Sequence, residues 1–200
     1  MYQRKDAFYT RAKTAGYRSR AVFKLLQLAQ GGRLLRRGDH VVDLGAWPGG
    51  WLQVASELVG PAGTVVGVDL RPIKPLPQKN VVTLVGDIAA ASTQREVARA
   101  CRGRADVILS DLAPKLSGVR ARDEAQTQVL AECVFAFVEK ILKPGGKLVV
   151  KLFMGDDLPR YVEQLRTRFT DVRTTRPEAT RKGSAEIYVI ASSFRGGAQQ

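Results

Sequence analysis

Residues 43–51 read Asp-Leu-Gly-Ala-Trp-Pro-Gly-Gly-Trp, and they continue the short apolar stretch His40–Leu44. A run of this length and composition predicts a buried strand. The glycines at 45, 49 and 50 let the chain turn sharply after the strand and pass close to a ligand, while Pro48 stiffens the turn. A helix is expected near Trp51–Val59. The stretch thus predicts a strand, a glycine-rich turn and a helix, the repeating unit of α/β domains.

Strand-like and helix-like segments alternate along the rest of the chain. Further helices are expected near 18–30, 93–101, 124–142 and 158–168. Further strands are expected at Thr64–Asp69, Val81–Val85, Asp106–Ser110, Lys147–Phe153, Val172–Thr175 and Glu186–Ala191. This order predicts a mostly parallel sheet covered by helices on both faces, in which ligands bind beyond the carboxyl ends of the strands.

The length of 200 residues suits one α/β domain with a substantial core. No internal repeat or long linker divides the sequence. We expect a basic, irregular arm over 1–17, a single domain over 18–194 and a flexible tail over 195–200. Ser19 is a candidate N-cap of the first helix.

Positive charge dominates the composition and is concentrated near the N-terminus. Lysine and arginine number 32 against 19 acidic residues, for a net charge of +13. Such an excess favours a polyanionic partner, of which nucleic acid is the commonest, over a merely solvated basic surface. The first 40 residues carry ten basic side chains with Tyr2, Phe8, Tyr9, Tyr17 and Phe23 among them. Guanidinium groups pair with phosphates and aromatic rings stack on unpaired bases, so this region is a candidate RNA-binding segment.

Other classes of site and location find little support in the sequence. The two cysteines, Cys101 and Cys133, and the single histidine, His40, form no zinc-binding pattern, so no metal is expected. An arginine-rich, acid-poor N-terminus is also typical of mitochondrial presequences, but this one is poor in serine. No apolar run approaches the roughly 20 residues that span a bilayer. A cytoplasmic location is therefore expected.

The spacing of the glycines indicates the class of cofactor. Dinucleotide-binding loops read G-x-G-x-x-G and hold a pyrophosphate, whereas this loop reads G-x-x-x-G-G. S-adenosylmethionine has no phosphate, so its loop needs to cradle only a sulfonium and an amino acid. A tight strand–helix turn without a ligand is the alternative.

Acidic residues at the strand ends fit a nucleoside cofactor better than a bare turn. Asp69 ends the second strand, where a carboxylate can accept hydrogen bonds from ribose hydroxyls. Asp87 follows the third strand and can accept from an adenine amino group. The predicted S-adenosylmethionine site comprises Asp43, Gly45, Pro48, Gly49, Gly50, Trp51, Asp69, Asp87 and Asp111.

Four further charged residues stand in places that invite a chemical role. Lys151 lies within the apolar strand V-V-K-L-F, where a charged lysine is costly unless it is paired or neutral. Asp111 ends the fourth strand, Glu186 opens the last, and Lys24 lies among apolar helical residues. Each also has an ordinary explanation: a snorkelling lysine, strand-end carboxylates and the polar edge of a helix.

Together these residues match a known family. The chain resembles the FtsJ-like ribosomal RNA 2′-O-methyltransferases, which share a Lys-Asp-Lys-Glu tetrad. The matching stretches are R-S-R-A-V-F-K-L (18–25), V-V-D-L-G-A-W-P-G-G-W (41–51), S-D-L-A-P-K-L-S-G (110–118), L-K-P-G-G-K-L-V-V-K-L-F (142–153) and S-A-E-I-Y-V-I-A (184–191). The resemblance implies a Rossmann-like class I methyltransferase fold, α/β with a seven-stranded, mostly parallel sheet, and Lys24, Asp111, Lys151 and Glu186 as the catalytic tetrad.

Two departures from the family pattern affect details rather than the reaction class. Trp47 stands where the ribosomal group usually has alanine, and the segment before Lys24 is shorter than in some members. Residues 116–118, Leu-Ser-Gly, resemble the ribosomal branch of the family rather than the transfer RNA branch. The expected substrate is therefore a uridine of large-subunit ribosomal RNA, and the protein is expected to act as a monomer without a membrane partner.

The resemblance also suggests a mechanism. Methyl transfer from a sulfonium to a ribose 2′-hydroxyl needs an aligned oxygen and a proton acceptor, for which Lys151 is the candidate. A lysine must be neutral to act as a base; Lys24 and burial favour that form, whereas Asp111 and Glu186 favour the ammonium. The alternatives are 2′-O-methylation of transfer RNA or an mRNA cap, or a non-catalytic RNA-binding ribosome-assembly factor. No N-P-P-Y-type loop or catalytic cysteine motif supports a base methyltransferase.

Overall fold

The computed structural model describes residues 7–31, 33–114, 120–181 and 183–196, with the side chains of 120–124 excepted. Residues 1–6 of the expected arm, 116–118 of the branch-specific motif and 197–200 of the expected tail lie outside this description. The helices are α1 (Ala7–Thr14), α2 (Val22–Leu28), α3 (Gly50–Val59), α4 (Ala91–Ala100), α5 (Arg120–Ile141) and α6 (Leu158–Arg168). The strands are β1 (His40–Leu44), β2 (Thr64–Asp69), β3 (Val81–Val85), β4 (Ala105–Ser110), β5 (Leu142–Phe153), β6 (Phe169–Thr175) and β7 (Glu186–Phe194).

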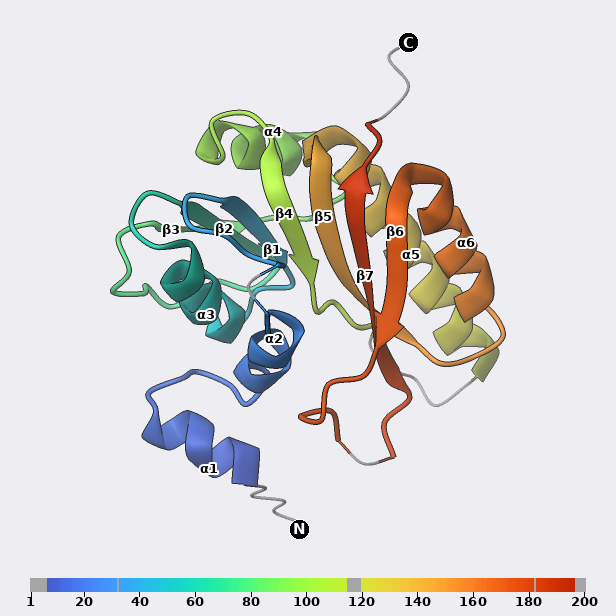
Figure 1. Cartoon of the computed structure of the whole chain (residues 1–200), viewed down its shortest axis with the longest axis horizontal. Coiled ribbons are helices and arrows are strands. Elements are labelled where there is room, and N and C mark those ends of the chain that lie inside the picture. Colours follow the sequence, from blue (N-terminus) through green and yellow to red (C-terminus); the bar gives the residue numbers. More distant parts are fainter. Residues whose placement is uncertain (1–6, 32, 115–119, 182, 197–200) are drawn as a thin grey trace.

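The strands form one seven-stranded sheet in the order β3-β2-β1-β4-β5-β7-β6 (Figure 1). The first five strands in this order, β3, β2, β1, β4 and β5, pair in parallel with their neighbours. Strand β7 is antiparallel to both β5 and β6. The order reverses between β1 and β4, and ligands bind at such a switch point in open α/β sheets. The predicted seven-stranded, mostly parallel sheet is confirmed.

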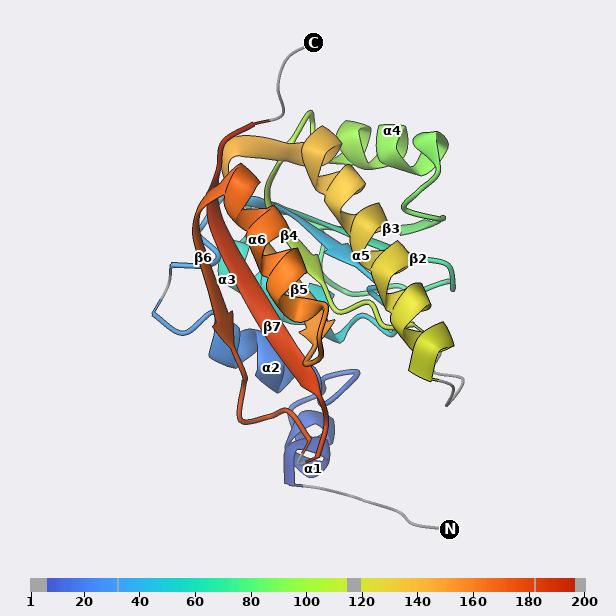
Figure 2. The same ribbon diagram turned by 90° about the vertical axis from the view of Figure 1, so that its right-hand side faces the viewer.

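Two hydrophobic cores hold helices to the two faces of this sheet. On one face α2 and α3 pack over β1 and β2, with Val41, Leu52 and Val65 among the buried residues. On the other face α4, α5 and α6 cover the sheet around Phe137 and Leu148, as the turned view shows (Figure 2). None of the described helices is long and apolar enough to cross a membrane.

The expectation of an irregular arm over 1–17 is wrong for its second half. Residues 7–14 form α1, and Ala12 on this helix is buried. The ring of Phe8 packs 5.4 Å from that of Phe23 in α2, and the hydroxyl of Tyr17 donates a hydrogen bond to Glu57 in α3. This segment is therefore helical and anchored on the domain, because its aromatic residues bury apolar surface there.

The start of the next helix is also corrected. Helix α2 begins at Val22 rather than near residue 18, and Ala21, not Ser19, occupies its N-cap position. Ser19 instead packs against the glycine-rich loop, where a Cβ on Gly50 would lie 2.5 Å from the Ser19 hydroxyl oxygen. The glycine at position 50 thus lets α2 and the loop approach each other closely.

Candidate active site

The glycine-rich loop joins β1 to α3 in a conformation that needs glycine at two places. Gly45 and Gly49 have φ angles of +77° and +105°, in the left-handed region that other residues rarely adopt. Arg18 fastens this loop to the segment after β2, since its guanidinium donates to the main-chain oxygens of Pro48, Lys74 and Pro75. Arg18 thus holds the loop in one position at the carboxyl end of β1.

The Asp69 carboxylate at the end of β2 binds this loop directly. Its two oxygens accept hydrogen bonds from the main-chain N–H groups of Trp47, at 2.9 Å, and Arg71, at 2.8 Å. The Arg71 guanidinium lies 3.6 Å from the centre of the Trp47 ring. Trp47, the departure from the family pattern, therefore contacts Asp69 through its main-chain N–H and Arg71 through its ring, while its side chain stays half exposed.

Two other predicted cofactor residues are placed differently. The Asp87 carboxylate, beyond β3, accepts a hydrogen bond from the main-chain N–H of Ala89 and remains exposed. Trp51 is buried, and its indole N–H donates to the main-chain oxygen of Ala21 at 2.8 Å. Trp51 therefore links α3 to the entrance of α2.

Asp43, near the end of β1, is a buried carboxylate without a hydrogen-bond partner among the described residues. Its side chain is almost fully buried, and both carboxylate oxygens lack such a partner. Burial, and then the nearby Asp111 and Asp69 carboxylates, raise the pKa of Asp43 well above its usual range. Buried carboxylates are normally paired or hydrogen-bonded. A cationic ligand at this switch point would supply the missing partner, so the residues fit a sulfonium or an ammonium group.

The tetrad residues predicted from the sequence come together at the same edge of the sheet. The Lys24 ammonium lies 2.6 Å from a carboxylate oxygen of Glu186. The Lys151 ammonium lies 3.0 Å from Oδ1 of Asp111 and also donates to the main-chain oxygen of that residue at 2.6 Å. Helix α2 and strands β4, β5 and β7, distant in sequence, thus contribute two ion pairs to one cluster.

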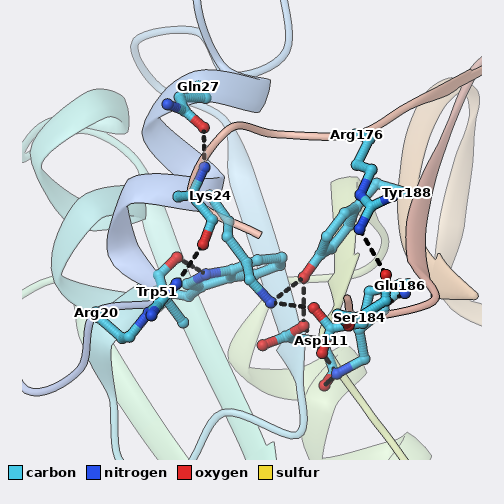
Figure 3. A network of polar contacts seen from close by, with 12 residues as sticks. Arg20, Lys24, Gln27, Trp51, Asp111, Arg176, Ser184, Glu186 and Tyr188 are labelled. Atoms are coloured by element: carbon cyan, nitrogen blue, oxygen red, sulfur yellow. Dashed lines mark hydrogen bonds and ion pairs between the residues drawn. The ribbon is translucent and has the colours of Figure 1, made fainter. Parts of the chain in front are cut away.

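Tyr188 connects the two ion pairs, and the sequence analysis did not single it out. Its hydroxyl donates to Oδ1 of Asp111 at 2.6 Å and accepts a hydrogen bond from Lys24 at 3.2 Å (Figure 3). Burial, followed by the Asp111 carboxylate, raises the pKa of Tyr188 far above its usual value, so the hydroxyl remains a donor. A signal was available, since alternate residues of a strand share a face and Tyr188 lies two residues after Glu186.

This geometry combines an orphaned carboxylate at the switch point with a chain of contacts that runs from Glu186 through Lys24, Tyr188 and Asp111 to Lys151. Comparison with other proteins agrees with it. The model of the family described as FtsJ-like methyltransferase matches residues 17–194. The chain belongs to the FtsJ-like methyltransferase family.

Two relatives show how close the likeness is. The ribosomal RNA large subunit methyltransferase E of Methanothrix thermoacetophila is 47% identical over 190 residues, which cover 95% of this chain and 73% of the relative. The protein of the same name from Methanothermobacter thermautotrophicus is 42% identical, over 97% of this chain and 92% of its own length. The match in the second case extends over nearly all of both proteins.

Solved structures agree on the fold. A Plasmodium falciparum protein described as a ribosomal RNA methyltransferase superposes with a TM-score of 0.81 at 28% identity, over 90% of this chain and all of its own. Fibrillarin from Aeropyrum pernix, solved with natively bound S-adenosyl-L-methionine, has a TM-score of 0.60, covering 88% of this chain and 75% of its own. At 17% identity it supports the fold alone. The predicted family, its Rossmann-like fold and its methyltransferase class are confirmed for this FtsJ-like chain.

Proposed function

We propose that this protein transfers a methyl group from S-adenosylmethionine to a ribose 2′-hydroxyl of RNA, and that its substrate is a uridine of large-subunit ribosomal RNA. The observation that carries the proposal is the cluster of Lys151, Asp111, Tyr188, Lys24 and Glu186 beside the orphaned carboxylate of Asp43. The relatives named as ribosomal RNA large subunit methyltransferases favour the same substrate.

The cofactor assignment rests on which groups line the switch point. Asp43 would pair with a cationic part of the cofactor, Asp69 would accept from its ribose hydroxyls, and Gly45 and Gly49 would let the backbone approach it. Pro48, Gly50, Trp51, Asp87 and Asp111 complete the proposed binding set. When bound, the cofactor supplies an activated methyl group on sulfur.

The chain's own contribution is to hold and activate the 2′-oxygen. A ribose hydroxyl is a weak acid, so a neighbouring base assists its attack. In our proposal Lys151 first releases its own ammonium proton and, as the neutral amine, takes the proton of the 2′-hydroxyl, while its two contacts with Asp111 fix the position of its nitrogen. The ribose would be oriented by Lys24 together with its two hydrogen-bond partners, Glu186 and the hydroxyl of Tyr188.

The RNA-binding role is assigned to the basic N-terminal region. Arg11 and Lys13 are exposed residues of α1. Helix α1 lies beside α2, the helix that contains Lys24 (Figure 1). Phosphate contacts there would lead RNA toward the tetrad. A monomer acting in the cytoplasm, without a metal, remains part of this proposal.

The test is to incubate the purified protein with radiolabelled S-adenosylmethionine and, in separate reactions, large ribosomal subunits, protein-free ribosomal RNA, transfer RNA and capped mRNA. Label confined to a 2′-O-methyluridine of ribosomal RNA is the expected result. Label in transfer RNA or the cap would reassign the substrate. RNA binding with no label in any substrate would favour a non-catalytic assembly factor.

A further inference from the structure

The loop between β6 and β7, described over residues 176–181 and 183–185, packs against α2 close to the tetrad residue Glu186. Ala179 in this loop is fully buried. Its main-chain N–H donates a 3.0 Å hydrogen bond to the side-chain oxygen of Gln27, and its main-chain oxygen accepts one from the Arg20 guanidinium (Figure 3). Both backbone groups of one buried residue are therefore held by the side chains of α2 and of the segment that leads into it.

The loop passes this anchorage on to Glu186. The main-chain N–H of Thr180 donates to Pro177 and that of Ser184 to Arg181, which gives the loop two tight turns. The Glu186 main-chain N–H then donates to the Ser184 hydroxyl oxygen at 3.2 Å. These hydrogen-bonded residues form a path along the described part of the loop, from the buried Ala179 to the main chain of Glu186, whose carboxylate belongs to the tetrad.

Helix α2 meets this path at two points. Lys24 and Gln27 are three residues apart, so both side chains leave the helix on the same side. Lys24 binds Glu186 at one end of the path, and Gln27 binds Ala179 at the other. With only seven residues and no side-chain N-cap, α2 depends on such tertiary contacts for its orientation.

The packing beside Gln27 is open rather than continuous. A cavity of about 240 Å³ lies between the end of α2 and the loop, lined by Gln27, Leu28, Gln30, Arg176 and Glu178 among others. The Gln27 side chain therefore borders this hollow, while its hydrogen-bond partner Ala179 packs in the hydrophobic core on that face of the sheet.

We infer that Gln27 is a positioning residue of the methyl-transfer site: its side-chain oxygen fixes the β6–β7 loop on α2 and so sets the geometry of the Lys24–Glu186 pair. This inference deepens the proposed function and rests on it. The side-chain oxygen of Gln27 is occupied by the Ala179 N–H, and Gln27 lies one helical turn from Lys24, so in this inference it acts through Lys24 and Glu186.

Single-turnover kinetics separate this role from a merely structural one. In Gln27→Leu the Ala179 N–H loses its acceptor, whereas Gln27→Glu keeps an oxygen at the same place. The rate constant measures site geometry, and the reaction amplitude measures the folded, active fraction. We expect Gln27→Leu to lower the rate constant about tenfold or more at full amplitude, because small misplacements of reacting groups are costly. Gln27→Glu should restore most of the rate, and Gln30→Leu, on the same cavity, should match the wild type.

A lower amplitude with an unchanged rate constant in Gln27→Leu would reduce Gln27 to a structural contact and overturn the inference, as would a wild-type rate. A second readout does not depend on activity: the ¹⁵N NMR signal of the Lys24 ammonium and hydrogen exchange at the Ala179 amide. Both should change in Gln27→Leu and recover in Gln27→Glu. If the wild type methylates no RNA, the proposed function fails, and an unchanged Lys24 signal in Gln27→Leu would still overturn the positioning role by itself.

Discussion

Tyr188 lies directly opposite Lys151 in the antiparallel ladder of β5 and β7, and both side chains bind the same oxygen, Oδ1, of Asp111. The tyrosine hydroxyl is 2.6 Å from that oxygen and the lysine ammonium is 3.0 Å from it. One carboxylate oxygen therefore sets the positions of the proposed base and of the hydroxyl that reaches Lys24. Removing either partner tests a different part of this arrangement.

Replacing Tyr188 by phenylalanine removes the hydroxyl and keeps the buried ring. The loss of one hydrogen bond to Asp111 should lower the free energy of unfolding by about 0.5–1.5 kcal/mol. We expect the single-turnover rate to fall roughly tenfold, because Lys24 and Asp111 lose their connection. Tyr161→Phe on α6 is the matched control, since it removes a hydroxyl from another largely buried tyrosine. Equal rates for the two variants would remove Tyr188 from the site.

Lys151→Met keeps the side-chain stem and removes the amine. The variant should fold and bind S-adenosylhomocysteine, yet lose ~10²–10⁴-fold in single-turnover rate, the usual contribution of a general base. Lys151→Arg should also fail, since a guanidinium stays protonated at any working pH. Near-wild-type methyl transfer by Lys151→Arg would exclude proton abstraction and leave an electrostatic role.

The control for this pair is Lys147→Met. Lys147 lies in the middle of the same strand, and its ammonium donates to the main-chain oxygens of Arg33 and Leu34. Its replacement removes a lysine amine from β5 without touching Asp111. We therefore expect Lys147→Met to retain the wild-type rate while losing some stability.

The sheet and the tetrad were predictable because their signals are local. Strands such as His40–Leu44 and Thr64–Asp69 are short apolar runs bounded by turns, and the structure has them at the predicted residues. Lys151 stood out as a charge within an apolar strand. Once the parallel order was expected, strand-end residues such as Asp111 had to meet at one edge.

Features that depend on tertiary contacts were not predictable in this way. Helix α1 is short and polar by sequence, and the structure shows why it forms: Ala12 is buried and Phe8 contacts Phe23 on α2. Tyr188 reads as an ordinary strand aromatic until β5 and β7 are paired. Likewise, nothing in the sequence around Gln27 indicates that Ala179, 152 residues later, will bind it.

The buried Asp43 should make the ligand-free protein less stable as the pH rises above about 3.9, the pKa of an unperturbed aspartate. Its pKa is raised in the folded state, so the folded chain holds the proton more tightly than the unfolded chain. The resulting stability is complete below the unfolded pKa, about 3.9, and is lost as the pH rises through the folded value. Asp43→Asn has no proton to lose, so the unfolding free energy of the variant minus that of the wild type should increase from pH 4 to pH 8.

Urea unfolding across that pH range measures the difference, with the exposed Asp171→Asn on β6 as the control. Calorimetry on the same Asp43→Asn protein should show weaker binding of S-adenosylmethionine, because the variant lacks the charge that pairs with a cation. A difference in unfolding free energy that does not increase from pH 4 to pH 8, or normal cofactor binding by the variant, would contradict the assignment of Asp43.

Salt dependence tests whether RNA contacts the α1 face. Deleting residues 1–17 would also remove the buried Ala12 and the Phe8–Phe23 contact, so charge changes are the cleaner experiment. Arg11→Gln with Lys13→Gln alters two exposed side chains on α1. If both side chains contact phosphates, the slope of log affinity against log salt should become less steep by roughly 1.4–1.8, since each contact contributes about 0.7–0.9 to its magnitude.

The matched control is Arg95→Gln with Arg99→Gln, two exposed arginines on α4, which lies at the opposite end of the molecule from α1 (Figure 1). Filter binding should show a full effect for the first pair and little for the second, while cofactor binding stays unchanged in both. An equal loss in the two double variants would mean that overall charge, rather than the α1 surface, attracts the RNA.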